Sequence, residues 1–317
     1  LDREGPVEED GGRPGSRDRR AQGNHAKKMV GARVRRQQVA FARARGLSSR
    51  RACALLMVAR SKLTYVSRLQ ARDAPAITTM RELSAQYPRY GYRKMRVFLE
   101  RRGQAMSAER AYRLWRQAGL QVPKLRPRRR IATGRPRPTP ATTVNHVWAY
   151  DFVFDTCADG RSLKCLTVVD EFTRECLAID VAGSIRSGRV IEVLTRLVSL
   201  HGAPRYLRSD NGPEFVATAV LRWLQTAQIE TAFIDPGKPW QNGTDESFNG
   251  KFRDECLTIE WFRNRLEAQV GIERWRRHYN DERPHMSLGD RTPAEFKSQI
   301  KSQSGCLGEA QPSAIFQ

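Results

Sequence analysis

The sequence predicts an α/β protein in which a core with a mixed five-stranded sheet and helices follows a small all-α region. Two observations carry this prediction. Strand-like and helix-like segments alternate after His146, whereas the segments before residue 123 show only helical spacing of apolar residues. Three acids, Asp151, Asp210 and Glu246, stand on elements of the second half, where the ligands of an open α/β sheet collect.

The first 30 residues are rich in Gly, Arg, Asp and Glu and contain almost no apolar side chains. Such a composition buries too little surface to offset the entropy of ordering, so we expect residues 1–30 to be disordered. The chain begins with Leu rather than Met, for which trimming, a non-standard start codon and a shifted reading frame are alternative explanations.

Residues 31–70 have the pattern of a helix-turn-helix. Ser48 is a good N-cap for a helix over 49–56, Met57-Val58-Ala59 forms the turn, and a second helix opens at Arg60. That second helix begins with basic and hydroxyl residues, which suit contacts to DNA phosphates. The candidate DNA-binding residues here are Arg60, Ser61 and Lys62.

Residues 73–122 predict a second helical unit, with apolar positions at helical spacing. Within it, the loop from Pro88 to Lys94 interleaves tyrosines with cations. One interpretation is that Arg89, Tyr92 and Arg93 stack on bases and contact phosphates. The other is a packed loop whose tyrosines separate helices, and the sequence does not decide between them.

A basic, proline-rich linker over 123–143 includes Arg128, Arg129 and Arg130, which we expect to follow a phosphate backbone. The charge of the whole chain is +22. Residues 1–150 hold 35 Lys and Arg against 10 Asp and Glu, whereas residues 151–317 hold 21 against 24. This asymmetry predicts that the first half binds a polyanion, with a salt-dependent affinity for nucleic acid.

Residues 144–298 predict the α/β core, and 299–317 a C-terminal tail. The expected elements are strands near 147–155, 163–170 and 175–182, a helix over 187–201, a strand ending at Asp210, a helix over 216–227, a strand over 229–234, and helices to about 280. Three neighbouring strands followed by crossover helices give a mixed sheet. This order of elements is that of a ribonuclease-H-like core.

The three acids predict a metal site. Period two in the first strand places Asp151 opposite the face of Trp148 and Tyr150; Asp210 ends a strand, and Glu246 lies on a helix. Phosphodiester chemistry uses two Mg²⁺ ions about 3.5 to 4 Å apart, held by carboxylates and the substrate phosphate, and Mn²⁺ is a possible substitute. Metal binding and phosphodiester chemistry are therefore the leading interpretation.

Other charged residues lie near these three acids in the sequence, and the acidic ones fit a metal site less well. Asp155 is better explained as a turn residue, Asp170 as a strand-end acid, and Asp245 points about 100° around the helix from Glu246. Lys251 and Arg253 are candidate phosphate contacts, and seven residues of helix place Arg253 below Glu246.

Cysteine spacing and apolar runs exclude two further classes of protein. The six cysteines form no Cys-x-x-Cys pair, which predicts neither a zinc site nor a disulfide framework. No window approaches eighteen uninterrupted apolar residues, and the N-terminus lacks a secretory signal. We therefore expect a protein of the reducing cytoplasm without membrane contact.

Four runs of sequence resemble the Asp-Asp-Glu transposases of the insertion-sequence-three family, relatives of retroviral integrases. They are Trp148-x-x-Asp151-Phe152, Ser209-Asp210-Asn211-Gly212-x-Glu214-Phe215, Asn242-Gly243-x-x-Glu246-Ser247-Phe248-Asn249-Gly250-Lys251 and Tyr279-Asn280-x-x-Arg283-Pro284-His285. Upstream, Arg50-Arg51-Ala52-Cys53 and the loop at Tyr90 are similar to the family's DNA-binding region, which adds Arg50 and Arg51 to the candidates. The resemblance covers roughly residues 40 to 298.

The resemblance implies that Asp151, Asp210 and Glu246 bind the metals and that the basic region recognises terminal inverted repeats. It also implies target DNA as a partner and a homo-multimer on DNA, with strand cleavage and transfer as the activity. The location that it implies is the bacterial cytoplasm, in association with the nucleoid. The chain looks like a second-frame product, and Met57 replaces the usual Gly of the turn. The alternatives are a nuclease on the same core and a catalytically silent DNA-binding regulator.

Overall fold

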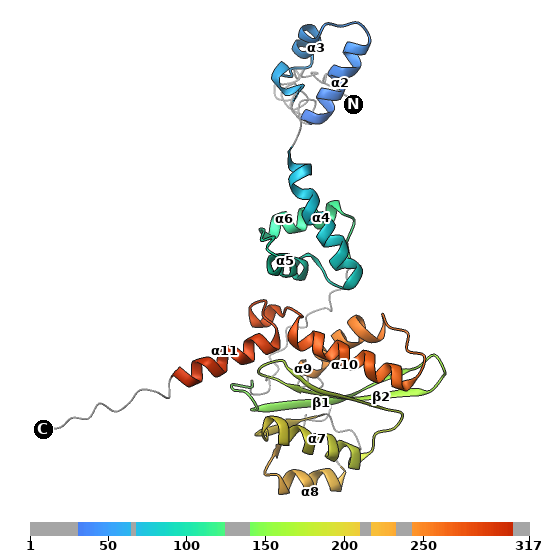
Figure 1. Cartoon of the computed structure of the whole chain (residues 1–317), viewed down its shortest axis with the longest axis vertical. Helices are drawn as coiled ribbons and strands as arrows, with labels where there is room; N and C mark the ends of the chain where they lie inside the picture. Colours follow the sequence, from blue (N-terminus) through green and yellow to red (C-terminus); the bar gives the residue numbers. More distant parts are fainter. Residues whose placement is uncertain (1–30, 65–67, 124–139, 210–216, 233–242, 307–317) are drawn as a thin grey trace, which may run out of the picture. The chain divides into compact units, whose positions relative to one another are not determined.

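The computed structural model describes residues 31–64, 68–123, 140–209, 217–232 and 243–306 (Figure 1). The chain divides into two compact units, Leu1–Ala74 and Pro75–Gln317. Among the described residues, no helix is both long enough and apolar enough to cross a membrane.

In the part of the first unit that the structure describes, α2 (Ala32–Ala44) and α3 (Ser49–Leu55) pack around Val39, Ala52 and Cys53. The predicted cap is present, since Ser48 Oγ accepts a hydrogen bond from the Arg51 N–H at 3.3 Å. The helix expected to open at Arg60 is, within the described residues, only a 3₁₀ turn over Arg60–Lys62. The expectation of a helix through Leu63 and Thr64 is wrong, because neither residue continues the turn as a helix and Leu63 packs against the cluster formed by α2 and α3.

The turn after α3 has a left-handed residue. Met57 has a φ of 51°, its side chain is 72% exposed, and the Val58 N–H returns to the Cys53 carbonyl at 2.9 Å. A side chain with a Cβ atom costs roughly 1 to 2 kcal/mol in this conformation. Met57 therefore strains the turn, and most of its surface faces solvent.

Met57→Gly is expected to raise the free energy of unfolding of this unit by about 1 kcal/mol, because glycine adopts the left-handed conformation without strain. Thermal denaturation followed by circular dichroism measures the shift. The matched control is Leu55→Gly, also 72% exposed but within α3, which should destabilise by about 1 kcal/mol. A lower melting temperature for Met57→Gly would contradict the strain argument.

A cluster of three helices lies at the start of the second compact unit. It corresponds to the second helical unit predicted over residues 73–122, and that name is kept for it. Its helices are α4 (Leu69–Gln86, which begins in the first unit), α5 (Tyr92–Arg101) and α6 (Ala108–Gln117). The apolar positions that predicted it are buried together: Met95, Phe98, Leu99, Ala111, Leu114 and Trp115. Ser107 caps α6 by accepting a hydrogen bond from the Arg110 N–H at 3.2 Å.

The α/β core follows the predicted order closely. Its elements are β1 (Val147–Thr156), β2 (Ser162–Asp170), β3 (Cys176–Ala182), α7 (Ser187–His201), β4 (Tyr206–Arg208), α8 (Thr218–Thr226), β5 (Glu230–Thr231), α9 (Gly243–Phe252), a π-helical turn (Arg253–Leu257), α10 (Arg265–Asp281) and α11 (Pro293–Cys306). The strand order is β3-β2-β1-β4-β5. β1, β2 and β3 are antiparallel neighbours, and β4 and β5 run parallel to β1, so the predicted mixed five-stranded, ribonuclease-H-like sheet is confirmed.

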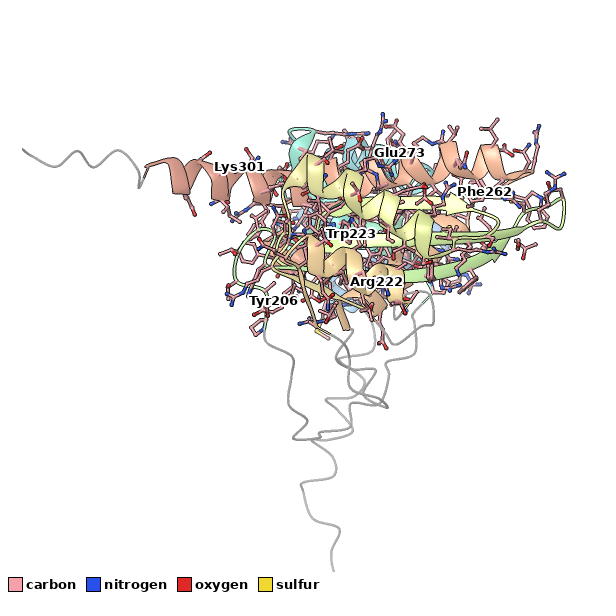
Figure 2. The ribbon with its side chains drawn as sticks, turned by 90° about the horizontal axis from the view of Figure 1, so that it is seen from below. Tyr206, Arg222, Trp223, Phe262, Glu273 and Lys301 are labelled. Atoms are coloured by element: carbon pink, nitrogen blue, oxygen red, sulfur yellow. The ribbon has the colours of Figure 1, made fainter. Side chains whose placement is uncertain are left out.

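Helices cover both faces of the sheet, with α7 and α8 below it and α10 above it in Figure 1. Trp148, Tyr150 and Leu166 pack in one cluster with side chains of α7 and α8. Trp223 of α8, labelled in Figure 2, packs against the same cluster. Val153 and Cys165 face the opposite way, toward the aromatic rings of α9 and α10. The alternation of period two thus buries β1 on both faces and places Asp151 on the side of α9.

Helix α11 extends into the segment predicted as a C-terminal tail, so that boundary is corrected. A capping box starts the helix, since the Thr292 N–H donates to Glu295 Oε2 at 2.7 Å and the Glu295 N–H donates to Thr292 Oγ1 at 3.1 Å. Pro293 occupies the first helical position, which its ring favours. The run Thr292-Pro293-Ala294-Glu295 is therefore a helix-start signal that is present in the sequence.

The second helical unit is held against the core by ion pairs and rings. Tyr90 is 3% exposed, and its hydroxyl lies 2.7 Å from His278 Nε2 on α10. Tyr87 stacks on the same His278 ring at 4.7 Å between centroids. For Tyr90, the structure therefore agrees with the packed-loop interpretation.

Glu255, in the π-helical turn after α9, is the hub of this contact, with a side chain only 8% exposed. Arg283 grips both of its oxygens at 2.6 Å, and Lys94 Nζ of α5 lies 2.8 Å from Oε1. Burial alone raises the pKa of Glu255, but the hydrogen bonds and charges of Arg283 and Lys94 outweigh it and lower the pKa to about 2. Burial, followed by repulsion from Arg283, lowers the pKa of Lys94 to about 8.

Glu255→Gln is expected to cost about 3 kcal/mol of unfolding free energy at pH 7, because it leaves Arg283 and Lys94 without their anion. The folded pKa lies below that of the unfolded chain, so this stabilisation is present above pH 4.5 and is lost as the pH falls toward 2. The difference between variant and wild type in urea unfolding should therefore narrow over that window. The exposed Glu260 provides the control Glu260→Gln, and a pH-independent difference for Glu255→Gln would contradict the linkage.

Candidate active site

Asp151 lies in the middle of β1, partly buried, on the sheet face that α9 covers. Its Oδ1 accepts a hydrogen bond from the Phe152 N–H at 2.7 Å, and its Oδ2 accepts one from Asn249 Nδ2 of α9 at 2.7 Å. Two donors from different elements thus fix the orientation of this carboxylate.

Asn249 is held in turn by Thr167, the residue directly across from Asp151 in the β1–β2 pairing. The Thr167 hydroxyl lies 3.1 Å from the Asp151 carbonyl oxygen and 3.3 Å from Asn249 Oδ1. Thr167 is fully buried and Asn249 is 8% exposed. The sequence analysis missed Asn249, although its position three residues after Glu246 on a helix would have indicated it.

Glu246 lies one turn before Asn249 on α9, on the exposed part of that helix, whereas its neighbour Asp245 is 0% exposed. Three residues of helix correspond to a rise of about 4.5 Å along the axis, so the backbone of Glu246 lies about one helical turn from Asn249, which binds Asp151. The expected difference in direction between Asp245 and Glu246 is therefore present, and Glu246 is the one that can reach a solvent-borne ligand.

Asp210 lies outside the described residues. The strand before it, β4, pairs in parallel with β1, with Leu207 beside Trp148 and Arg208 beside Ala149. Arg208 forms a buried bidentate ion pair with Glu171, with its Nη1 at 2.6 and 2.7 Å from the two oxygens. Burial raises the pKa of Glu171, and the charge of Arg208 opposes that rise. This pair fastens the end of β4 to the end of β2.

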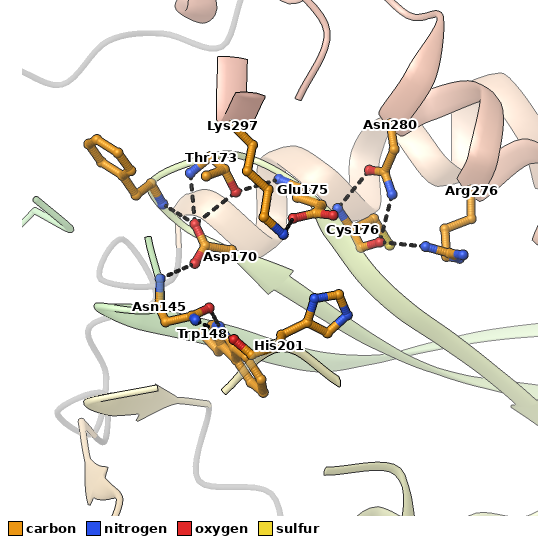
Figure 3. A network of polar contacts seen from close by, with 11 residues as sticks. Asn145, Trp148, Asp170, Thr173, Glu175, Cys176, His201, Arg276, Asn280 and Lys297 are labelled. Carbon is orange, nitrogen blue, oxygen red and sulfur yellow. Dashed lines mark hydrogen bonds and ion pairs between the residues drawn. The ribbon is translucent and has the colours of Figure 1, made fainter. Parts of the chain in front are cut away.

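Asp170 has the structural role that was expected of it, whereas Asp155 lies within β1, paired with Leu163, and not in the expected turn. The Asp170 carboxylate is 1% exposed and accepts hydrogen bonds from the N–H groups of Asn145, Phe172 and Thr173 and from the Thr173 hydroxyl (Figure 3). It therefore closes the turn after β2. Asp155, near the end of β1, accepts from the Thr156 N–H at 2.8 Å.

The two cations after Glu246 are engaged within the protein. Lys251 Nζ donates to Ser247 Oγ at 2.9 Å, and burial, followed by repulsion from Arg283, lowers its pKa to about 8. Helix α9 ends at Phe252, and Arg253 Nη1 donates to the Phe154 carbonyl on β1 at 3.3 Å. Their contacts to phosphate remain predictions.

The candidate DNA-binding residues fall into three groups. Those of the first unit are all exposed: Arg50, Arg51, Arg60, Ser61 and Lys62. Arg89, in the loop before α5, lies 3.5 Å from Asp254 of the core, whereas Tyr92 and Arg93 form the start of α5, where Arg93 is exposed. Arg128, Arg129 and Arg130 lie outside the described residues.

The last of the four runs that carry the resemblance, from Tyr279 to His285, is built into the core. The Asn280 side chain accepts from the Cys176 N–H and donates to the Cys176 carbonyl, both at 2.9 Å, so it extends the edge of β3 (Figure 3). The His285 ring packs edge-on against Tyr279, and burial, with repulsion from Arg283, lowers the pKa of His285 to about 3. This run supports the site by packing rather than by facing it.

Comparisons with known families cover most of the chain. Residues 141–239 and 227–293 match models described as integrase core domain, and residues 70–130 match an HTH-like domain. The chain is 40% identical over 257 residues to the insertion element IS476 uncharacterized 39.2 kDa protein of Xanthomonas euvesicatoria, an overlap that covers 81% of this chain and 74% of the relative. It is 39% identical to the insertion element IS407 uncharacterized 31.7 kDa protein of Burkholderia multivorans, with 81% and 92% covered.

A more distant relative is the transposase InsD for the insertion element IS2 of Escherichia coli, which is 27% identical, with 72% of this chain and 79% of the relative covered. Among solved structures, the catalytic core domain of BIV integrase superposes with a TM-score of 0.41 at 18% identity, covering 51% of this chain and 99% of that one. On the sequence relatives and the matched domains, the chain belongs to the insertion-sequence-three family of transposases.

Proposed function

We propose that this chain cleaves DNA strands at the terminal inverted repeats of its insertion element and transfers them to target DNA, using Asp151, Asp210 and Glu246. The observation that supports this most is the hydrogen bond from Asn249 to Asp151. It joins β1 to α9 one helical turn from Glu246, so two of the three acids come from elements that are fastened together at this point.

The register of the sheet supports the place of Asp210 in the set. Arg208 pairs with Ala149, and these two residues stand two positions before Asp210 and Asp151 in the sequence. Continuation of the same parallel pairing would bring the two aspartates side by side. The buried Arg208–Glu171 ion pair fixes the end of β4 in this register beside β1.

The donor set fits Mg²⁺, which prefers hard oxygen ligands. Asp151 is partly accessible and held in one orientation, and Glu246 is exposed. Among the described residues no three His, Cys, Asp or Glu side chains form a metal-binding group, and the third acid of the proposed set, Asp210, is not one of those residues. When bound, a metal pair would activate the attacking oxygen and neutralise charge on the transferring phosphate, with Mn²⁺ as a substitute for Mg²⁺.

The chain's own residues supply orientation and charge. Asn249 and the Phe152 N–H keep the Asp151 carboxylate turned toward the side of α9. Lys251 and Arg253 are the cations nearest in sequence to Glu246 and would bind the substrate phosphate. A water or a strand's 3′ hydroxyl then attacks the phosphorus in line, and the 3′ oxygen of the cleaved bond leaves, without a covalent link to the protein.

We place this reaction in the bacterial cytoplasm, on a homo-multimer assembled on the element's ends and target DNA. The HTH-like domain and the charge of +25 over residues 1–150 support DNA as the partner. A nuclease on the same core would cut without joining strands, and a silent regulator would bind without cutting, so the assay below separates all three functions.

Asp151→Asn, Asp210→Asn and Glu246→Gln should each lower strand joining of duplex oligonucleotides carrying the element's ends by roughly a thousandfold, because each removes a charge that holds the metals. Electrophoresis of labelled products in Mg²⁺ measures cleavage and joining separately. Asp155→Asn and Asp159→Asn are the matched controls and should retain activity. Wild-type joining by any of the first three variants would exclude that acid from the site.

Asn249→Leu should reduce joining by about 10- to 100-fold and raise the Mg²⁺ concentration needed for half-maximal rate, because Asp151 loses its second orienting donor. Thr167→Val, which removes the hydroxyl behind Asn249, should show the same direction of change to a smaller extent. A lower rate with an unchanged Mg²⁺ requirement would mean that Asn249 only packs α9 against the sheet.

A further inference from the structure

Two sets of cations on the second helical unit differ in their surroundings. One set is neutralised by acids of the core: Arg89 by Asp254, Lys94 by Glu255, Arg96 by Asp290, and Arg101 by Glu295. Arg101 also donates to the Glu282 carbonyl at 2.7 Å. These four cations lie on α5 or just before it, so this side of the unit is occupied by the protein itself.

The other set lies where α5 begins and along α6. Arg93 stands 5.7 Å from the centre of the Tyr92 ring and donates to its hydroxyl at 3.3 Å. The Tyr92 ring meets Tyr112 edge-on at 5.1 Å, and Arg116 lies 5.9 Å from the centre of the Tyr112 ring. The four side chains therefore form a continuous row, cation to ring to ring to cation.

This row faces solvent. Arg93 and Arg116 are exposed and Tyr112 is 43% exposed. Among the residues that the structure describes, neither Arg93 nor Arg116 forms an ion pair with an acid, in contrast to the four docked cations. The rings are anchored from behind, because Tyr92 and Tyr112 both contact Trp115, which is 8% exposed. Two guanidinium groups are thus presented on a rigid aromatic support.

We propose that the row of Arg93, Tyr92, Tyr112 and Arg116 is the DNA-binding surface of the second helical unit. It binds two phosphates of duplex DNA, while the cations on the docked side of α5 make no DNA contact. This inference rests on the proposed function, since it assigns a surface to the DNA on which the protein acts. Guanidinium groups held on rings lose little entropy on binding, and the tyrosine hydroxyls add phosphate donors.

The two sets of cations have different roles on the same helical unit. The docked cations tie the helical unit to the turn that follows α9, the helix of Glu246. The exposed row would hold the DNA on the same unit. Binding of the duplex and placement of the acids would therefore be connected through one small helical cluster.

The experiment measures binding without chemistry, in EDTA, with the full chain and a fluorescent random duplex of about 30 base pairs over a range of salt. Arg93→Gln/Arg116→Gln should lower the slope of log affinity against log salt by about 2, since each lost phosphate contact removes roughly 0.9. Affinity at 0.1 M salt should fall by about tenfold for each arginine. The charge-keeping Arg93→Lys/Arg116→Lys should restore most of the slope.

The control is Arg102→Gln/Arg189→Gln, which removes the same charge from two exposed arginines that already pair with Glu82 and Asp180. It should leave the slope nearly unchanged. An unchanged slope in Arg93→Gln/Arg116→Gln, or an equal loss in the control, would overturn the proposal. Since no cleavage is measured, a failure of the proposed strand transfer would leave this result readable, and circular dichroism verifies that each variant is folded.

Discussion

The need to bury strand β1 on both of its faces constrains the rest of the core. Its alternating side chains face two different hydrophobic clusters, one under α7 and α8 and one under α9 and α10. A shift of one residue in the pairing with β2 would exchange the two sets and turn Asp151 away from α9. The register that buries Trp148 and Val153 on opposite faces is thus the same one that delivers the carboxylate to Asn249.

The polar contacts around the site form layers of support. Thr167 holds Asn249, and Asn249 holds Asp151, each across a different element. Beyond them, the Arg208–Glu171 pair fastens β4, and the Glu255–Arg283 pair fastens the turn that ends α9. A buried ion pair of this kind adds little net stability compared with apolar packing, but it fixes geometry, since removing one partner leaves an uncompensated charge. We infer that these pairs are kept for the position of the acids.

The excess of positive charge has more than one use. Part of it neutralises acids of the more acidic half, through Lys94 at Glu255 and Arg96 at Asp290. This cost of desolvation is visible in the pKa of Lys94, which burial lowers to about 8. Cations that remain exposed, such as Arg50 and Arg51 of the first unit and Arg116 of α6, are the ones that can meet a phosphate. Net charge alone therefore overstates the surface that can bind DNA.

Apolar periodicity was enough to predict the order and type of the core elements: α7 was expected over 187–201 and is present there. The sequence also separated Glu246 from Asp245, since a helix fixes a 100° difference between neighbours. The roles of Tyr90, of the α5 cations and of Asn249 could not be predicted in this way, because they depend on partners about 100 to 200 residues away in the chain. Local spacing in the sequence predicts which face of a helix or strand a residue occupies. Whether a polar side chain can be buried there depends on the hydrogen-bond or ion-pair partner that another part of the chain supplies.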